Sequence, residues 1–406
     1  MLRLLEEGSM DWNDSAPEAE FRTQVRSFIN EHGSKQRGAG DGEEAQFGNS
    51  PEVRAKTKPW RDALVANGWI APAWPKSYGG AGLSPKEQFI LNEELAENGL
   101  SNVGGFGVMM LGPTLMIHGN EEQKAEHLGK ILAGDVVWAQ GWSEPSAGSD
   151  LASLQTRAIR DGDEYVVNGQ KIWTSGAQHA DWIYMLARTD PDSPKHRGIS
   201  LLMFSMKTPG VDVRPLINMA DQHGFNEVFF EDVRVPVKNR LGEENRGWYV
   251  GMTLTDYERS GIGSAVGTQR RLKQLLDTSR NDPQAKLAEG TRSKTWRLQF
   301  ADRWIEAEIA RLFSYLNISL QARNLVPNYE ASMSKLYTTE LGQRIAHTAL
   351  KMYGLQGNVW DAKRPENGQG RVASGYLSAV SATIAGGTSE IQRGIIATRG
   401  LGLPRG

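Results

Sequence analysis

The sequence predicts an α+β multidomain protein with an N-terminal helical domain, a middle β domain built as a barrel or sandwich, and a C-terminal four-helix bundle. Three observations support this prediction. Helical segments broken by Gly and Pro fill residues 10–134, short strands with hairpin-type turns fill residues 135–241, and apolar residues spaced three and four apart return in residues 242–406. Residues 1–9 precede a second methionine and look like the remnant of a tag.

Composition excludes several classes of protein. The 406 residues suffice for about two to four domains. The chain has 46 Lys and Arg against 48 Asp and Glu, so it lacks the excess of positive charge expected of a protein that binds nucleic acid or anionic membranes. Since there is no cysteine, disulfides and thiolate metal sites are excluded, and the seven scattered histidines form no zinc motif, so we predict no metal. No apolar stretch approaches the length of a membrane helix and no signal peptide is recognisable, which predicts a cytoplasmic protein without membrane insertion.

In the N-terminal region, the spacing of apolar residues predicts helices over residues 20–31, 51–67 and 85–98. The polar, Gly-rich residues 34–49 show no period, so we expect a loop there.

In the middle region, Asp161-Gly162 and Asn168-Gly169 are dipeptides typical of hairpin turns, and they bracket a predicted strand at residues 164–167. Further strands are expected over residues 182–188, 198–206, 211–215 and 227–233. Several short strands separated by turns indicate a compact β domain.

In the C-terminal region, two apolar stripes predict helices that face a core. The first consists of Leu298, Ala301, Ile305, Ile309, Leu312, Leu316 and Leu320, and the second of Met333, Tyr337, Leu341, Ile345, Thr348 and Met352. Gly354 occupies the place of a glycine that ends the second helix. With a helix expected over residues 248–280 and a terminal helix, the stripes indicate a four-helix bundle.

Two segments at the start of the β region could contact a ligand. Residues 142–150 combine small and hydroxylated side chains, which leave backbone N–H groups accessible. Residues 171–176 place Trp173 beside two hydroxyls, so that an aromatic plane and polar groups could receive a ring system together. Taken alone, a segment like the first is more often a polar turn, and a Trp at a strand end, as Trp173 is, is more often a packing residue.

A third segment, residues 386–393, places a glycine pair before a predicted helix, and its Ser389 and Gln392 have the spacing of a capping box. Free N–H groups at a helix start favour a phosphate or a carbonyl oxygen that accumulates negative charge. An ordinary capped helix is the alternative. Because the glycine-rich fingerprints of nucleotide-binding loops are missing, any nucleotide must be held in another way.

In their order and spacing, these segments resemble one family, the acyl-CoA dehydrogenases, which are FAD enzymes with a helical, a β and a helical-bundle domain. The resemblance covers nearly the whole chain and depends on residues 142–150, 162–176 and 386–393. Residues 78–84 and 93–96 are also similar to the family's N-terminal domain.

The resemblance implies which residues contact FAD and substrate. It implies a flavin ring lined by Gln140, Trp142, Ser143, Trp173 and Ser175. The last helix and a neighbouring subunit are implied to complete the FAD site with Arg280, Lys351, Gly354, Thr388 and Glu390. The implied contacts of the acyl-CoA substrate are Ser149 and Arg259.

The implied reaction oxidises an acyl-CoA to its trans-2-enoyl-CoA, with a base removing the α-proton while the β-hydrogen leaves as hydride. Many members carry the catalytic glutamate immediately before Gly-Thr-Ser, where this chain has Gly386. A minority place it in a Glu-Arg pair early in the C-terminal domain, which matches Glu258 and Arg259. We therefore predict Glu258 as the base and the backbone N–H of Gly386 as the group that polarises the thioester carbonyl. The alternative is that Glu258 and Arg259 form a solvated ion pair.

The resemblance also implies partners: an acyl-CoA substrate, an electron-transfer flavoprotein as acceptor, and further subunits. A shared FAD site implies a homodimer or homotetramer, with a hetero-oligomer as the alternative. The small Ala385 and Gly386 suggest space for a bulky or branched acyl chain. Two other functions are consistent with the sequence: a flavin-dependent monooxygenase on the same fold, and a subunit of a hetero-oligomeric acyl-CoA dehydrogenase.

Overall fold

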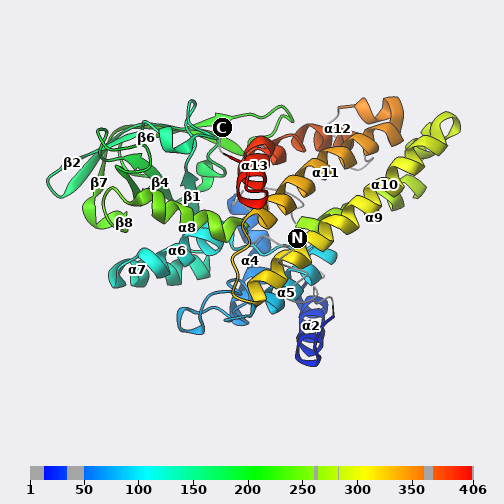
Figure 1. Cartoon of the computed structure of the whole chain (residues 1–406), viewed down its shortest axis with the longest axis horizontal. Coiled ribbons are helices and arrows are strands. Elements are labelled where there is room, and N and C mark those ends of the chain that lie inside the picture. Colours follow the sequence, from blue (N-terminus) through cyan, green and yellow to red (C-terminus); the bar gives the residue numbers. More distant parts are fainter. Residues whose placement is uncertain (1–12, 34–49, 260–263, 282, 361–368, 405–406) are drawn as a thin grey trace. The chain divides into compact units, whose positions relative to one another are not determined.

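The computed structural model describes residues 13–33, 50–259, 264–281, 283–360 and 369–404 (Figure 1). Along parts of the helices, which include residues 255–259 and 283–295, only the backbone is described, and Glu258 and Arg259 are among these positions. The predicted tag remnant and the loop expected over residues 34–49 lie outside the described residues.

The chain divides into two compact units. One, here called the bundle unit, comprises Met1–Arg26, Ser84–Gly99 and Gly261–Gly406. The other, the sheet unit, comprises Ser27–Leu83 and Leu100–Ser260. Each unit is assembled from segments that are distant in the sequence.

The N-terminal region is helical, as predicted. Its elements are α2 Ala16–Phe28, η1 Ile29–Gly33, α4 Pro51–Ala66, η2 Lys76–Tyr78, α5 Pro85–Glu97, η3 Gly107–Leu111, α6 Gly112–His118 and α7 Glu121–Ala133. Local hydrogen bonds fix where α5 begins. The Ser84 side chain accepts from the Glu87 backbone N–H, and the Glu87 carboxylate accepts from the Ser84 N–H. Pro85 occupies the first helical position, where no N–H is needed.

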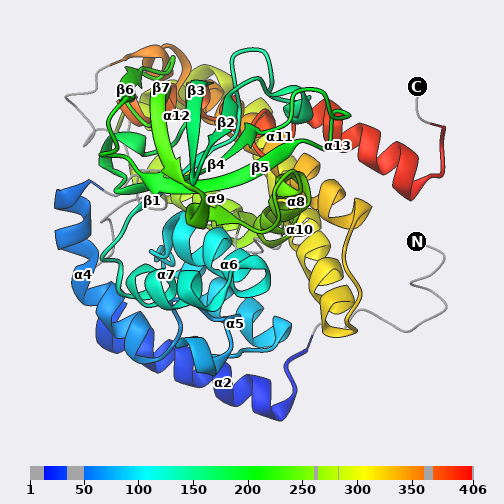
Figure 2. The same ribbon diagram turned by 90° about the vertical axis from the view of Figure 1, so that its left-hand side faces the viewer.

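The middle region forms one sheet. Its described strands are β1 Trp138–Gly141, β2 Arg157–Asp161, β3 Glu164–Lys171, β4 Trp182–Arg188, β5 Ile199–Ser205, β6 Val211–Leu216, β7 Phe225–Pro236 and β8 Arg240–Leu241. They pair in the order β6-β7-β3-β2-β4-β5-β8, and β1 pairs with β4. Figure 2 shows the strands β6, β7, β3, β2, β4 and β5 of this sheet. Most pairs are antiparallel, whereas β1 and β2 each run parallel to β4. The predicted β domain is confirmed, but the described strands do not close into a barrel, because β6 and β8 remain at opposite ends of the order.

One of the two predicted hairpin turns is wrong. Asp161 pairs with Glu164 across a tight turn in which Gly162 has a φ of 61°, as expected. Asn168-Gly169 instead lies inside β3, where the register with β7 shifts. At Gly169 an added Cβ would lie 2.6 Å from the Thr156 hydroxyl oxygen, so close packing rather than a chain reversal requires the glycine.

The sheet unit has an apolar core formed by alternate residues of the strands. Its fully buried side chains include Tyr165, Val167, Ile183, Met185, Leu202 and Val228. The strands that carry the ligand-binding candidates are therefore anchored on one side by this core.

The C-terminal region is helical, as predicted. Its elements are α8 Gly247–Arg259, α9 Ser264–Asn281, α10 Pro283–Ala322, α11 Tyr329–Tyr353, η7 Gly354–Asn358, α12 Gln369–Ser378, η9 Ser381–Thr383, α13 Ser389–Ile395 and η10 Ile396–Gly400. The helix predicted over residues 248–280 corresponds to α8 and α9, and residues 260–263 between them lie outside the described part. In the bundle unit α9, α10 and α11 pack against one another, and α5 packs on α9 and α10 (Figure 1).

The apolar stripe predicted to bury α10 in the core is mostly exposed. Leu298 is 70% exposed, Ile305 59% and Leu312 40%. The core of the bundle unit instead contains Phe300, Ala307 and Ala310 from α10, which pack with residues of α9 and α11. Small Ala side chains allow helices to approach closely. The face of α10 that is buried in the core is therefore the one with the smaller side chains, and the face with the larger apolar side chains is exposed to solvent.

The second predicted stripe is confirmed. On α11, Leu341, Ile345, Thr348 and Met352 are buried. The helix ends at Tyr353, and the following Gly354 has a φ of 57°. A positive φ favours glycine at this position, because any other residue would carry a side chain that clashes with the backbone.

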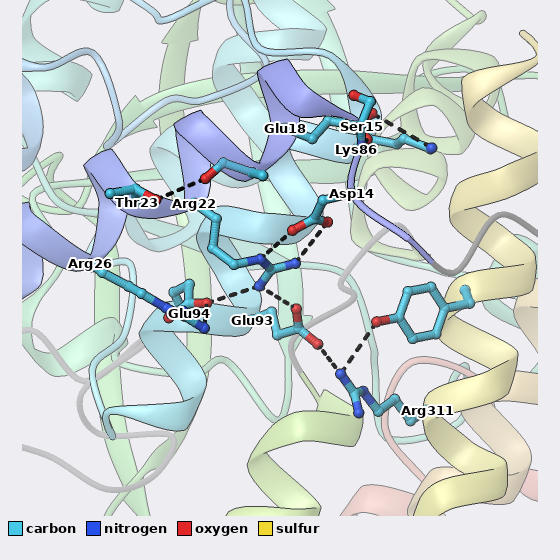
Figure 3. A network of polar contacts seen from close by, with 12 residues as sticks. Asp14, Ser15, Glu18, Arg22, Thr23, Arg26, Lys86, Glu93, Glu94 and Arg311 are labelled. Carbon is cyan, nitrogen blue, oxygen red and sulfur yellow. Dashed lines mark hydrogen bonds and ion pairs between the residues drawn. The ribbon is translucent and has the colours of Figure 1, made fainter.

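A network of charged side chains joins three helices of the bundle unit (Figure 3). Arg22 of α2 donates to Glu93, at 2.7 Å, and to Glu94, at 2.9 Å, both on α5. The second oxygen of Glu93 accepts from Arg311 of α10 at 2.7 Å. Glu93 is 3% exposed and Glu94 2%, so two buried carboxylates are neutralised by arginines from other helices.

Within the described residues, no helix is both long enough and apolar enough to cross a lipid bilayer.

Candidate functional site

The first candidate segment follows the edge of the sheet. Gln140 lies in β1, directly opposite Tyr184 of β4, and Trp142 and Ser143 come immediately after the strand. All three candidates are half-buried. The Trp142 ring lies against α8, because a Cβ added to Gly251 would be 3.0 Å from the tip of the indole.

The second candidate segment follows β3. Trp173 has a φ of 59°, which is unusual for a residue with a side chain, and the residue is 55% exposed. Its ring makes an edge-to-face contact with Phe225, at 6.0 Å between centroids. Such a strained backbone that presents an aromatic face is typical of a ligand contact.

Asn226 of β7 holds this second segment in place. Its fully buried side chain donates to the carbonyl of Thr174, and the N–H of Thr174 donates to the carbonyl of Asn226. The next residue, Ser175, is half-buried. Sequence reasoning missed Asn226, because it lies one residue before the strand predicted over residues 227–233 and its partner Thr174 is distant in the sequence.

The structure brings these two segments together. The N–H of Ile172 donates to the carbonyl of Ser143 at 2.9 Å. Lys171 at the end of β3 also donates to the carbonyl of Trp142 at 3.1 Å and to the carboxylate of Glu144 at 2.8 Å. Sequence reasoning gave no role to Lys171 or Glu144, because Lys171 follows the polar stretch Asn168-Gly169-Gln170 and no local pattern marks it as buried.

The joined segments offer donors that are not used within the protein. Among the described residues, the buried indole N–H of Trp142 and the buried hydroxyl of Thr174 have no hydrogen-bond partner. Because buried polar groups are normally paired, such groups point to a missing ligand. With the exposed ring of Trp173, they fit a large aromatic ligand that has polar edges, as a flavin has.

Ser149 lies further along the first segment and is exposed. The adjacent Asp150 forms an ion pair with Lys195. Ser149 is thus accessible to a ligand outside the buried part of the segment.

The predicted base and its neighbour lie in the last turn of α8, which ends at Arg259. The side chains of Glu258 and Arg259 lie outside the described part of the chain, so the prediction of Glu258 as the base remains a prediction.

In the bundle unit, the glycine pair forms a tight loop, with φ values of 63° at Gly386 and 89° at Gly387. The carbonyl of Gly387 accepts from Lys335 at 2.7 Å, and the carbonyl of Gly386 accepts from Gln392 at 3.0 Å. Among the described residues, the backbone N–H of Gly386 has no acceptor. Both carbonyls are therefore held, whereas this N–H is available.

The predicted capping box of the last helix is wrong by one residue. Thr388, not Ser389, is the N-cap of α13, and its hydroxyl accepts from the Ile391 N–H at 3.2 Å. The Gln392 side chain turns back to the glycine loop instead of to the cap. Glu390 in the first turn is exposed, and its pKa is lowered by hydrogen bonds from its own backbone N–H and from Thr388.

The remaining candidates of the bundle unit lie at helix ends. Arg280 is exposed near the end of α9, 3.9 Å from Asp277. Lys351 is exposed in the last turn of α11, just before Gly354. Neither cation has a buried partner among the described residues, which is compatible with contacts to another molecule. No group of His, Asp or Glu side chains within the described ranges could hold a metal ion.

Three family models match the chain. They are described as the N-terminal, middle and C-terminal domains of acyl-CoA dehydrogenase and match residues 15–135, 139–233 and 245–401. Together they follow the helical, sheet and helical regions of the chain.

Curated relatives and solved structures agree with these matches. The acyl-CoA dehydrogenase FadE26 of Mycobacterium tuberculosis is 37% identical over 84% of this chain and 86% of its own length. The acyl-CoA dehydrogenase IpdE1 of the same organism is 34% identical over 95% of this chain and 98% of its own. The solved structure of the Tcur3481-Tcur3483 steroid ACAD has a TM-score of 0.81 at 32% identity and covers 98% of this chain and 100% of that one. The ChsE4-ChsE5 complex from Mycobacterium tuberculosis has a TM-score of 0.78 at 33% identity, with the same coverage.

Proposed function

Since the chain belongs to the acyl-CoA dehydrogenase family and is therefore an oxidoreductase, we propose that it uses FAD to oxidise an acyl-CoA thioester to its trans-2-enoyl-CoA. The observation that carries this proposal is the junction of the two segments in the sheet unit. Their exposed Trp173 ring and the unpartnered donors of Trp142 and Thr174 suit a flavin.

In this proposal, Gln140, Trp142, Ser143, Trp173 and Ser175 line the flavin ring. Thr388 and Glu390 contact the cofactor from α13, and Arg280, Lys351 and Gly354 contact it across a subunit boundary. When bound, FAD would supply the acceptor for the β-hydrogen, and an electron-transfer flavoprotein is the proposed partner that would reoxidise the enzyme.

The chain's own residues manage the α-proton and the thioester carbonyl. We assign Glu258 as the base, because Gly386 has no side chain that could take a proton. The free N–H of Gly386 donates to the carbonyl oxygen as negative charge develops on it. Lys335 and Gln392 support that role, since they hold the two carbonyls of the loop and so limit its rotation.

For the substrate, we propose a bulky acyl group such as a steroid side chain. Ala385 and Gly386 leave space where larger side chains would restrict it. One solved relative is named as a steroid enzyme, which supports the same class of substrate here.

The test is reduction of the bound flavin in the absence of oxygen. We expect the visible flavin absorbance of the purified protein to be lost when a steroid side-chain acyl-CoA is added, and to change less with butyryl-CoA or octanoyl-CoA. Reduction by short straight-chain substrates alone would contradict the substrate, and no reduction by any acyl-CoA would contradict the reaction.

A flavin-dependent monooxygenase is the second candidate, because it needs no carboxylate before Gly-Thr-Ser and this chain has Gly386 there. Oxygen-dependent hydroxylation of a substrate when reduced flavin is supplied would favour that function.

We further propose that the exposed stripe of α10 contacts a second copy of the chain, which gives a homodimer or homotetramer. Leu298, Ile305 and Leu312 lie seven residues apart on one side of α10 and are exposed, and large exposed apolar side chains that share one side of a helix can mark an interface. A different chain is the alternative occupant, since relatives include a complex of two differently named chains.

Replacing Ile305 by glutamate should convert the oligomer to monomers, because a charge would be buried in the interface. Light scattering after size-exclusion chromatography measures the change, and Ile305→Leu is the matched control that should keep the wild-type mass. An oligomer of unchanged mass in Ile305→Glu would show that this face is not the interface. A wild-type chain that is monomeric alone and assembles only with a co-expressed partner would indicate the hetero-oligomer.

A further inference from the structure

A buried ion pair joins the two candidate segments of the sheet unit, residues 142–150 and 171–176. Lys171 is 0% exposed and the Glu144 side chain 5%, and the Lys171 ammonium lies 2.8 Å from the Glu144 carboxylate. Lys171 is the last residue of β3, and Glu144 follows Ser143 in the first segment. The pair therefore connects the strand that leads into Trp173 with the loop that carries Trp142.

Glu144 has further partners that fix its carboxylate. One oxygen accepts from the backbone N–H of Gln155 at 2.6 Å, and the other accepts from that of Thr156 at 3.0 Å. The backbone of Glu144 also exchanges two hydrogen bonds with Ala147, which closes a small turn. Each carboxylate oxygen is thus bonded, and the loop has little freedom to shift.

Lys171 is equally constrained. Besides Glu144, its ammonium donates to the carbonyl of Trp142 at 3.1 Å. In the strand, Lys171 pairs with Val228 of β7. A movement of either segment would break a charge-assisted hydrogen bond in a place that water does not reach.

Burial and neighbouring groups shift the pKa of both Lys171 and Glu144. Burial lowers the pKa of Lys171, and the Glu144 carboxylate opposes this effect. Burial alone would raise the pKa of Glu144, but Lys171, Thr156 and the backbone N–H of Gln155 hold it below its ordinary value. The carboxylate is therefore ionised at neutral pH and needs its cation.

Stability does not explain such a pair. Burying two charges costs a desolvation energy that their attraction often only balances, and apolar residues of the same volume frequently serve as well. A buried pair can instead specify one arrangement of the groups bonded to it.

We propose that Lys171 and Glu144 are positioning residues, which set the distance and orientation between the Trp142–Ser143 segment and the Trp173–Ser175 segment that receive the flavin. The proposal rests on the proposed function, because it names the flavin as the ligand of these segments. Neither residue needs to touch the cofactor, since both act through the backbone to which they are bonded.

Replacing Lys171 by methionine keeps the length of the side chain and removes its charge and donors. We expect FAD to bind at least on the order of tenfold more weakly, as for the loss of a hydrogen bond between charged groups. The absorption spectrum of the flavin that remains bound should also change, because its surroundings are displaced. Glu144→Gln disturbs the same pair from the other side and should have the same effects, which keeps the test decisive if one variant folds poorly.

Two further measurements separate positioning from a purely structural role. In the apoprotein of Lys171→Met, the Ile172 N–H should exchange faster with solvent, because its bond to Ser143 depends on the pair. Lys195→Met removes an exposed lysine from an ion pair nearby, in which Lys195 is 50% exposed, and should leave FAD affinity, spectrum and exchange unchanged.

The outcomes are distinguishable. If wild type binds FAD and both variants bind it with the same affinity and spectrum, the positioning role is wrong while the proposed function stands. If wild type does not bind FAD, the proposed function fails, and hydrogen exchange at Ile172 still tests whether the pair joins the segments. Unchanged exchange in both variants would overturn the inference in either case.

Discussion

Replacing Glu258 by glutamine should slow the anaerobic reduction of bound FAD by an acyl-CoA by on the order of a hundredfold or more. Glutamine has nearly the shape of glutamate but cannot accept the α-proton. The α-carbon is a weak acid even when the carbonyl is polarised, so transfer to a positioned base limits the rate of the chemical step. Stopped-flow absorbance of the flavin, with saturating substrate, measures this rate directly.

A control distinguishes loss of the base from loss of the cofactor site. The affinity of Glu258→Gln for FAD should equal that of wild type, and Glu243→Gln, an exposed carboxylate that precedes the same helix, should reduce its flavin at the wild-type rate. Reduction of Glu258→Gln at the wild-type rate would show that another group is the base.

Removing the carboxylate of Glu93 should destabilise the protein by about 3–5 kcal/mol, the range found when one partner of a buried ion pair is deleted. In Glu93→Ala, Arg22 keeps Asp14 and Glu94 as partners, whereas Arg311 keeps the hydroxyl of Tyr315, which carries no charge. The cost therefore arises chiefly at Arg311, which would lose its hydrogen-bonded carboxylate and keep only the weaker attraction of Glu308. The measurement is the thermal unfolding midpoint of the apoprotein, which we expect to fall by several degrees.

The matched comparison is Lys58→Ala, which breaks an ion pair between side chains that are 69% and 55% exposed. Surface pairs contribute little, so its midpoint should stay within about a degree of wild type. A Glu93→Ala protein that unfolds at the wild-type temperature would mean that Arg311 finds water or another acceptor, and that the network is not a source of stability.

Much of the fold could be predicted from the sequence because its signals are local. The capping box at Ser84 and Glu87 and the glycine after α11 each act within one turn of a helix. The strand predicted over residues 182–188 coincides with β4. The hairpin turn predicted at Asn168-Gly169 is wrong because the same dipeptide is suited to a hairpin turn and to a β-bulge. Only the pairing with the opposing strand β7 distinguishes the two.

The candidate site was predictable as a set of segments but not as an arrangement. The resemblance implies Trp142, Ser143 and Trp173 as site residues, which remains a prediction, and the structure adds the hydrogen bond between Ser143 and Ile172 that brings their segments together. Asn226 and Lys171 could not be assigned from spacing, because each acts on residues far away in the sequence.

The sequence by itself determined where many helices and strands begin and end, and to which family the chain is similar, because periodicity, caps and motifs act over a few neighbouring residues. Only the tertiary structure decided which face of α10 enters the core and which charges are buried with a partner. Burial and ion pairing depend on groups that folding brings together, so Leu298 can be apolar and yet exposed, while Lys171 can be charged and yet buried.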